Sequence, residues 1–284
     1  MTRRDLSRLR VAPGSTVALA DFDPAFIPNW STGVQLESSV ERLAEYQERL
    51  AAQDSDALLV VLQGIDASGK DGTIRHVLSG VNPQGVVVHS FKAPSDEELQ
   101  HDYLRRYALR LPDRGQIAVF NRSHYEEVLI VRVHPELLGR EKVAKDEHIW
   151  KRRYREINEW ERYLNDNGIH VAKVFLNLSK DEQRKRFLAR IDEPEKNWKF
   201  NAADVAERRF WDDYQRVFAE MLSHTSTEWA PWYVIPADDK KVARVVVAEV
   251  LVDALAAIDP SYPTLDDEAR RELEKARAGL EAEG

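Results

Sequence analysis

Residues 58–78 constrain the fold more than any other part of this chain. The apolar run at 58–62 is short and contains adjacent valines, which favours a buried strand over a helix. Residues 64–70, GIDASGK, then fit the pattern G-x-x-x-x-G-K, and residues 73–78 predict the first turns of a helix. A strand, a glycine loop, a lysine and a helix in this order are typical of a phosphate-binding loop.

The chemistry of this loop suits an anion. Glycines let backbone N–H groups turn inward, and the start of the following helix adds partial positive charge. Asp71 departs from the usual pattern, because nucleotide-binding loops place Ser or Thr after the lysine as a ligand for Mg²⁺, and Asp66 lies inside the loop instead. The alternative is a purely structural glycine turn. The loop residues predicted to hold phosphate or nucleotide are Gly64, Ala67, Ser68, Gly69, Lys70, Asp71, Gly72 and Thr73.

The remaining apolar segments indicate an α/β protein. Further strands are predicted at 86–91, 117–120, 171–176 and 232–236, and helices at 36–52, 96–110, 142–167, 202–222 and 240–258. Nearly continuous apolar strands that alternate with helices predict a three-layer fold, in which a parallel sheet has helices on both faces. Ligands bind beyond the carboxyl ends of such strands. The glycine loop, Lys92 and the Asn121–Arg122 pair all follow strands and should meet there.

Three regions are predicted along the chain. Residues 1–55 form an arm and a helix, residues 56–258 form the phosphate-loop domain, and residues 259–284 form a charged tail with a loosely packed helix. Aromatic and apolar side chains should anchor the arm, either against its own domain or against another copy of the chain. These anchors are Phe22, Phe26, Ile27 and Trp30.

Composition excludes several classes of protein. The 284 residues carry a net charge of −8, which argues against a general nucleic-acid binder. The chain contains no cysteine, so disulfides, thiol catalysis and cysteine-bound zinc are excluded. We find no secretory signal pattern and no apolar stretch long enough to span a bilayer, and we expect a cytoplasmic protein.

Acidic residues near the predicted strand ends suggest a metal site. Phosphoryl transfer needs aligned phosphates, a divalent cation and positive charge over the migrating group. Asp66 and Glu126 could hold Mg²⁺, with Mn²⁺ as the alternative ion, and Asn121 could add a neutral oxygen ligand. The alternative for Glu126 is a solvated residue at the start of a helix.

A basic segment at 180–200 is the second strong signal in the sequence. It combines a run of Lys and Arg with Pro194, in the place where small-molecule kinases carry a lid. Arginine suits bidentate binding of phosphate, and a lid would exclude water. The alternative is a solvated charged helix. Trp198 and Phe200 lie beside this lid, where they could contact a base.

Five segments together resemble one known family. They read GIDASGKDGTI, FKAPSDEE, FNRSHYEEVLIVRVHPE, RIDEPEKNWKF and TSTEWAPWYVIPADDK. Over residues 30–258 the chain resembles the polyphosphate kinase 2 family. The resemblance implies a phosphate-loop kinase fold related to thymidylate kinase, which moves a phosphoryl group between inorganic polyphosphate and nucleotides with Mg²⁺. It also suggests a dimer or tetramer.

The resemblance assigns roles to individual residues. Asp66 and Lys70 match the acid and the lysine of the family's loop, Arg122 matches the arginine after the third strand, and Arg186 and Arg190 fall in its lid. With Glu126, the implied catalytic set is Asp66, Lys70, Arg122, Glu126 and Arg186. A basic channel for polyphosphate would comprise Lys92, Arg122, Arg132 and the lid.

Asn121 and Glu126 also bear on the acceptor. Many members of the family have Asp and Asn at these two positions, whereas Asn with Glu resembles the subgroup that phosphorylates both AMP and ADP. Lys92 resembles that subgroup as well. Adenine nucleotides are therefore the expected acceptors, with guanine nucleotides left open.

Two other functions fit the same residues. A nucleoside monophosphate kinase with ATP as donor would share the loop and the lid, although Asp71 and Asn121 suit a conventional ATP–Mg²⁺ site less well. A non-catalytic polyphosphate-binding module would lack metal carboxylates, and Asp66 and Glu126 argue against it.

Overall fold

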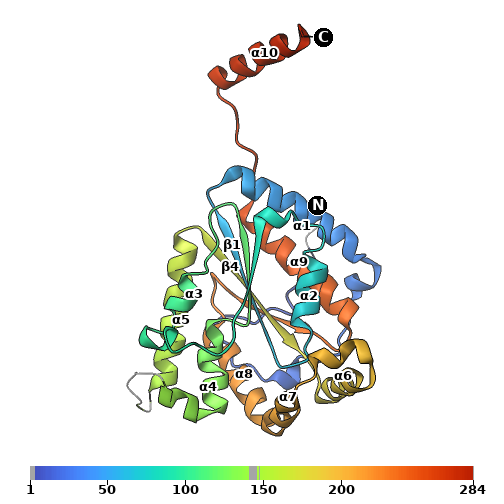
Figure 1. Ribbon diagram of the computed structural model, residues 1–284, viewed down its shortest axis with the longest axis vertical. Coiled ribbons are helices and arrows are strands. Elements are labelled where there is room, and N and C mark those ends of the chain that lie inside the picture. The colour runs from blue at the N-terminus through green and yellow to red at the C-terminus, as the bar shows by residue number, and fades with distance from the viewer. Residues whose placement is uncertain (1–3, 141–145, 147, 284) are drawn as a thin grey trace.

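A five-stranded parallel sheet forms the centre of the molecule (Figure 1). The computed structural model describes residues 4–140, 146 and 148–283. The strand order is β2-β3-β1-β4-β5, so the strand before the phosphate loop lies in the middle. The strands are β1 Ala57–Gly64, β2 Val86–Ser90, β3 Ile117–Asn121, β4 Ile169–Asn177 and β5 Trp232–Pro236. The predicted fold class and all five predicted strands are confirmed.

Helices cover both faces of this sheet. On one face lie α1 Leu36–Gln53, α2 Lys70–Val77 and α9 Lys240–Ile258. On the other face lie α3 Arg105–Ala108, α4 Ile130–Val133, α5 Ile149–Asp166 and α8 Trp211–Thr225. Near the carboxyl end of β4 follow α6 Lys180–Asp192 and α7 Ala202–Glu207, and α10 Asp267–Glu281 ends the chain (Figure 1). Short 3-10 helices occupy Leu19–Asp21, Asn29–Gly33, Pro83–Gly85, Glu98–Gln100, His124–Val128 (η5), Pro135–Arg140, Pro194–Lys199 (η7) and Arg208–Phe210.

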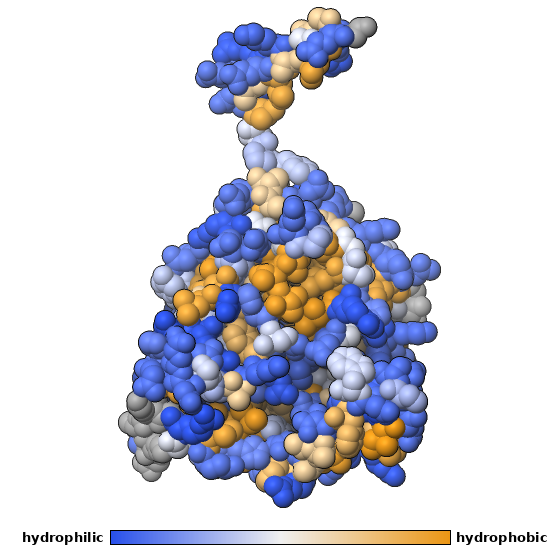
Figure 2. Space-filling model, viewed as in Figure 1, coloured by the Kyte–Doolittle hydropathy of each residue, from blue (hydrophilic) through white to orange (hydrophobic). Residues whose placement is uncertain are grey.

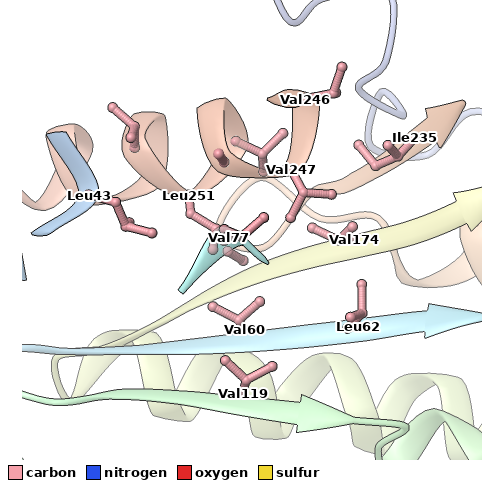
Figure 3. Packing of buried hydrophobic residues seen from close by; sticks show 14 of the residues in the cluster. Leu43, Val60, Leu62, Val77, Val119, Val174, Ile235, Val246, Val247 and Leu251 are labelled. Carbon is pink, nitrogen blue, oxygen red and sulfur yellow. The ribbon is translucent and has the colours of Figure 1, made fainter. Parts of the chain in front are cut away.

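The two-residue period of β1 divides the core into two layers. Val60 and Leu62 point toward α1, α2 and α9, where Figure 3 shows them beside Val119, Val174 and Val247. Leu59 and Val61 belong to the opposite cluster with α5 and α8. Because β1 is buried on both faces, the unbroken apolar run at 57–62 supplies side chains to both layers of the core.

The predicted helix at 96–110 is wrong. Its capping box does form, since Ser95 N–H donates to Glu98 Oε2 at 2.8 Å and Glu98 N–H donates to Ser95 Oγ at 3.2 Å. The helix nevertheless ends after one 3-10 turn at Gln100. Asp102 then accepts hydrogen bonds from the next free amides and begins α3 as a separate turn.

Three other helix boundaries differ from the prediction. The phosphate-loop helix α2 begins at Lys70 rather than at residue 73. The helix predicted at 202–222 is divided into α7, a 3-10 turn and α8, and the break lies where Arg208 donates to Lys180 O and Gln183 Oε1 of α6. Helix α5 begins at Ile149, while residues 141–145 and 147 of the predicted 142–167 helix lie outside the described residues.

The N-terminal arm packs along the last strand of its own domain. Val11 N–H donates to Trp232 O at 2.9 Å, and Val234 N–H donates to Leu9 O at 2.8 Å. Leu6, Leu9 and Val11 are buried, so they anchor the arm more firmly than the sequence suggested.

The predicted aromatic anchors of the arm are largely present. Phe22, Phe26 and Trp30 are partly buried against the core. Ile27 is 47% exposed, so its prediction as an anchor is wrong.

Helix α10 stands apart from the domain (Figure 1). It contains no buried residue, and its surface mixes hydrophobic and hydrophilic side chains (Figure 2). The loosely packed terminal helix predicted from the charge pattern is therefore confirmed. Within the described ranges, no helix combines the length and the apolarity needed to cross a bilayer.

Deletion of residues 264–284 should leave the domain's stability unchanged, because α10 buries no side chain in the core. We expect the midpoint of thermal unfolding to stay within about 2 °C of the full chain, measured by calorimetry. A fall of more than about 5 °C would show that the tail stabilises the domain.

Candidate active site

The loop between β1 and α2 has the backbone of an anion-binding turn. Gly64 and Gly69 have φ angles of 155° and 105°, and Ala67 also has a positive φ of 63°. A Cβ atom on Gly64 would lie 2.8 Å from Ser68 Oγ and 3.0 Å from Leu176 O. Gly64 is therefore required both by its conformation and by the space around it.

The side chain of Lys70 lies inside this loop and binds its backbone. Its Nζ donates to Gly64 O at 2.6 Å and to Ile65 O at 3.3 Å. Burial, reinforced by the nearby Arg122 charge, lowers the pKa of Lys70 to about 8. Ser68 Oγ is also buried and has no hydrogen-bond partner among the described residues. The loop thus contains a cation and a hydroxyl without a hydrogen-bond partner in the described part of the chain, and an anion bound there could accept hydrogen bonds from both.

Arg122 joins the two carboxylates that the sequence singled out. Its Nη2 lies 2.6 Å from Asp66 Oδ1, and its Nη1 lies 3.5 Å from Glu126 Oε2. Glu126 and Asp66 together raise the pKa of Arg122 against the opposing effect of burial. Arg122 has a positive φ of 61°, a strained conformation for a residue with a side chain. The fold therefore brings Asp66 to the Arg122–Glu126 pair, although Asp66 and Arg122 are 56 residues apart in sequence.

Asn121 explains the unusual acid after the loop lysine. At the end of β3, its Nδ2 donates to Asp71 Oδ1 at 2.7 Å and to Ser90 Oγ at 3.3 Å. A carboxylate can only accept, so the amide nitrogen must face Asp71. Asn121 therefore links Asp71 and Ser90 to the end of β3, and its amide oxygen is the atom left for a ligand.

The residues at this edge fit a magnesium ion. The described part of the chain contains no cluster of three or more His, Asp or Glu side chains that could form a complete metal cage. Mg²⁺ seldom uses such cages, because it binds one or two carboxylates together with substrate phosphates and water. Asp66 and Glu126, which share Arg122, supply that number of carboxylates. The same oxygen ligands suit Mn²⁺.

Arg186 braces the phosphate loop from α6. Its Nη1 donates to Ala67 O at 3.0 Å and Ser68 O at 2.9 Å, while its Nη2 donates to Ala237 O at 2.6 Å and Asp238 O at 3.1 Å. Its Nε donates to Glu182 at 3.0 Å. All five N–H groups of the guanidinium are thus engaged. Arg186 supports the loop backbone and presents no free donor to a phosphate.

The predicted lid has two parts in the structure. The first part of α6 is bound to the loop through Arg186 and through Gln183 Nε2, which donates to Asp66 O at 2.9 Å. Arg190 lines the cleft and lies 3.5 Å from Asp204 Oδ2. Beyond it, Trp198 is 78% exposed. The residues that stay candidates for a lid are therefore 190–200, because the first part of α6 is bound to the loop.

A cleft of about 1170 Å³ extends on both sides of the loop. Its Lys and Arg residues outnumber its Asp and Glu residues by about two to one, although the whole chain is acidic. Lys92 lines the cleft as predicted. Arg132 is outside the residues that line it, because its guanidinium contacts Glu220 at 2.5 Å and Tyr154 OH at 2.6 Å. The prediction that Arg132 belongs to the basic channel is therefore wrong.

The sequence analysis missed several cations of the cleft. Arg75, Lys240 and Arg244 line it beside the loop. Burial and the charges of Arg75 and Arg186 lower the pKa of Arg244, which shows how closely these cations are gathered. Lys240 and Arg244 are four residues apart on α9 and so share one face of that helix, a spacing that could have been noticed. Arg106 and Arg140 line the cleft on the side of Lys92.

Comparison with known proteins identifies the family. Residues 31–263 match the model of polyphosphate kinase 2. The chain belongs to the polyphosphate kinase 2 family. It is 50% identical to an ADP-polyphosphate phosphotransferase of Rhodopseudomonas palustris, over 96% of this chain and 97% of that protein. It is 44% identical to an AMP/ADP-polyphosphate phosphotransferase of Meiothermus ruber, over 91% of this chain and 96% of that protein.

A solved structure confirms the fold of this polyphosphate kinase 2 protein. The crystal structure of polyphosphate kinase 2 from Arthrobacter aurescens matches with a TM-score of 0.85 and 40% identity. The match covers 96% of this chain and 97% of the other.

Replacement of Arg186 by Ala should reduce stability, because four backbone carbonyl groups would lose their donors. We expect a loss of about 3 kcal/mol in the free energy of unfolding, measured in urea. Arg190→Ala is the matched control in the same helix and should lose less than about 1 kcal/mol. Equal stability of the two variants would contradict the bracing role.

Proposed function

We propose that this protein transfers the terminal phosphoryl group of inorganic polyphosphate to AMP and ADP, giving ADP and ATP, with Mg²⁺ as cofactor. The observation that carries the proposal is the grouping of Asp66, Arg122 and Glu126 beside Lys70 on the floor of a basic cleft. This grouping provides metal ligands and positive charge at one point, as phosphoryl transfer requires.

The shape and charge of the cleft support a polymeric donor. Cations continue from the loop in two directions, toward Lys92, Arg106 and Arg140 on one side and toward Lys240 and Arg244 on the other. A single nucleotide needs only a few such charges, whereas a polyphosphate chain offers charge along its whole length. The extended cationic path therefore favours polyphosphate over ATP as the donor.

Asp71 also argues against the ATP-dependent alternative. A conventional nucleotide loop offers a hydroxyl to Mg²⁺ at this position. Here the Asp71 carboxylate is held by Asn121 at 2.7 Å, and the Asp66 and Glu126 carboxylates beside Arg122 would hold the metal instead. The two similar proteins from Rhodopseudomonas palustris and Meiothermus ruber, named for ADP and for AMP/ADP as acceptors, support the same choice.

The chain's own side chains have distinct tasks in this reaction. The Lys70 cation would exchange its carbonyl partners for a phosphate oxygen, and Arg122 would stabilise charge on the migrating group. Bound Mg²⁺, held by Asp66 and Glu126, would neutralise the phosphate oxygens that these cations do not reach. Residues 190–200 would cover the cleft and exclude water as a competing acceptor.

Turnover with defined donors tests the function. With Mg²⁺ and polyphosphate, AMP should give ADP and then ATP, and ADP should give ATP, as followed by chromatography. Lys70→Ala should lower kcat by about 10³-fold while its circular dichroism stays unchanged, because the loop's central cation is lost. Turnover of AMP with ATP but none with polyphosphate would support a nucleoside monophosphate kinase. Binding of polyphosphate without turnover would support a binding module.

The pH dependence of polyphosphate binding tests the role of Lys70. Its pKa of about 8 in the free protein means that the cation is present at pH 7 and is largely lost at pH 9. We expect the KM for polyphosphate to rise about tenfold between these pH values, measured at saturating ADP and Mg²⁺. Lys70→Arg keeps its charge and should show a nearly constant KM. The same rise in both proteins would assign the effect to another group.

A further inference from the structure

Glu126 is the one residue of its 3-10 turn that is not buried, and it lines the cleft together with Glu127. In η5, the neighbours His124, Tyr125 and Val128 are completely buried, and Glu127 is 7% exposed. Glu126 itself lines the cleft and lies 3.5 Å from Arg122. The position of this carboxylate is therefore set by the buried contacts of the residues beside it.

A single buried carboxylate holds the two residues before Glu126. Tyr125 OH donates to Glu161 Oε1 at 2.7 Å, and His124 Nε2 lies 3.2 Å from the same oxygen. Burial lowers the pKa of His124, so its neutral ring donates the Nε2 hydrogen to Glu161. Glu161 lies on α5 and is completely buried. It thus connects α5 directly to the turn that carries Glu126.

Lys173 fixes this carboxylate from the central sheet. Its Nζ donates to Glu161 Oε2 at 2.6 Å, to Tyr125 OH at 2.9 Å and to Thr225 O at 2.5 Å. Burial raises the pKa of Glu161, but Lys173 and His124 outweigh it and hold the pKa below its usual value. Burial also lowers the pKa of Lys173, against the opposing effect of Glu161. The hydrogen bonds of the two groups give each of them a defined direction.

The residue after Glu126 is held from the other side. Arg153 Nη1 donates to the backbone oxygen of Glu127 at 2.6 Å, and Tyr107 OH lies 3.2 Å from Glu127 Oε1. Both sides of Glu126 are consequently anchored to the helices and strands behind it. Its carboxylate lies 3.5 Å from Arg122, which also contacts Asp66.

The energetics suggest what the buried pair contributes. An ion pair removed from water costs desolvation, and apolar residues of similar volume often stabilise a fold equally well. Glu161 and Lys173 therefore orient the side chains that they contact more than they stabilise the fold. We propose that Glu161, held by Lys173, is a positioning residue that fixes Glu126 for divalent metal binding. This inference rests on the proposed role of Glu126 as a metal ligand.

Two double variants separate positioning from stability. Glu161→Gln with Lys173→Met removes both charges but keeps an acceptor oxygen for Tyr125 and His124. Glu161→Leu with Lys173→Met removes the charges and the acceptor. Both replacements are uncharged and close to the original volume. The probe is Mn²⁺ in the presence of ADP, with free ion measured by electron paramagnetic resonance, next to thermal unfolding and the Mg²⁺ dependence of turnover.

The Leu variant should bind Mn²⁺ at least about tenfold more weakly, which is the usual loss when a group that orients a metal ligand is removed. The Gln variant should stay within about threefold of the wild type, and both should unfold near the wild-type temperature. Wild-type Mn²⁺ binding in the Leu variant, or equal losses in both variants, would overturn the proposal. If the Leu variant does not fold, Tyr125→Phe should weaken Mn²⁺ binding at unchanged stability, and unchanged binding would overturn it.

Glu126→Gln distinguishes this inference from the proposed function. Its Mn²⁺ binding should fall at least as far as that of the Leu variant. If Glu126→Gln binds Mn²⁺ like the wild type, the metal role of Glu126 fails and the positioning proposal fails with it. If the wild type binds Mn²⁺ but does not turn over polyphosphate, the proposed function is refuted. The Mn²⁺ comparison between the variants then still tests the positioning role.

Discussion

The parallel pairing of β1 with β3 is the interaction on which the whole site depends. Leu62 pairs with Asn121, and Arg122 N–H then donates to Leu62 O at 3.2 Å. This register ends both strands at the same edge of the sheet. It brings the phosphate loop after β1 and the Arg122–Glu126 turn after β3 within contact of each other. A shift of one residue would turn Arg122 to the other face of the sheet and separate it from Asp66.

Charge in this protein is organised locally and not by overall composition. The net charge of −8 would repel a polyanion, yet the cleft gathers cations from several elements. Packing of α2 against α9 brings Arg75 near Arg244, and the energetic cost of that proximity appears as the lowered pKa of Arg244. A bound chain of phosphates would relieve this repulsion. Packing of the helices thus keeps these mutually repelling cations close together in the absence of an anion.

The buried polar groups behind the site have the opposite character. Arg186 donates to four backbone carbonyl groups and to Glu182, and Lys173 and Glu161 are completely buried and paired. Such groups gain little stability from being charged, but their bonds are directional. They support the two neighbouring loops in which Ala67 and Arg122 have positive φ angles. The phosphate loop is thus held from behind by Arg186 and Gln183 of α6.

The sequence by itself determined the sheet and the loop. The central strands β1 and β3 can be predicted from residue type because both of their faces are buried, and the bounds of β5 and α9 agree with the prediction. Glycine spacing likewise specifies the loop, since only glycine fits at Gly64. The tail and the strand-end positions of Asp66, Asn121 and Arg122 follow from the same local rules.

Only the tertiary structure decided what the long side chains do. Arg132 and Arg186 looked alike in sequence, yet Glu220 holds Arg132 away from the cleft, and the carbonyl groups of Ala237 and Asp238 hold Arg186 against the loop. The partners lie 88 and about 50 residues away, respectively, so no local pattern could name them. A flexible cation binds whichever acceptor the fold places nearby, and that choice is made by packing.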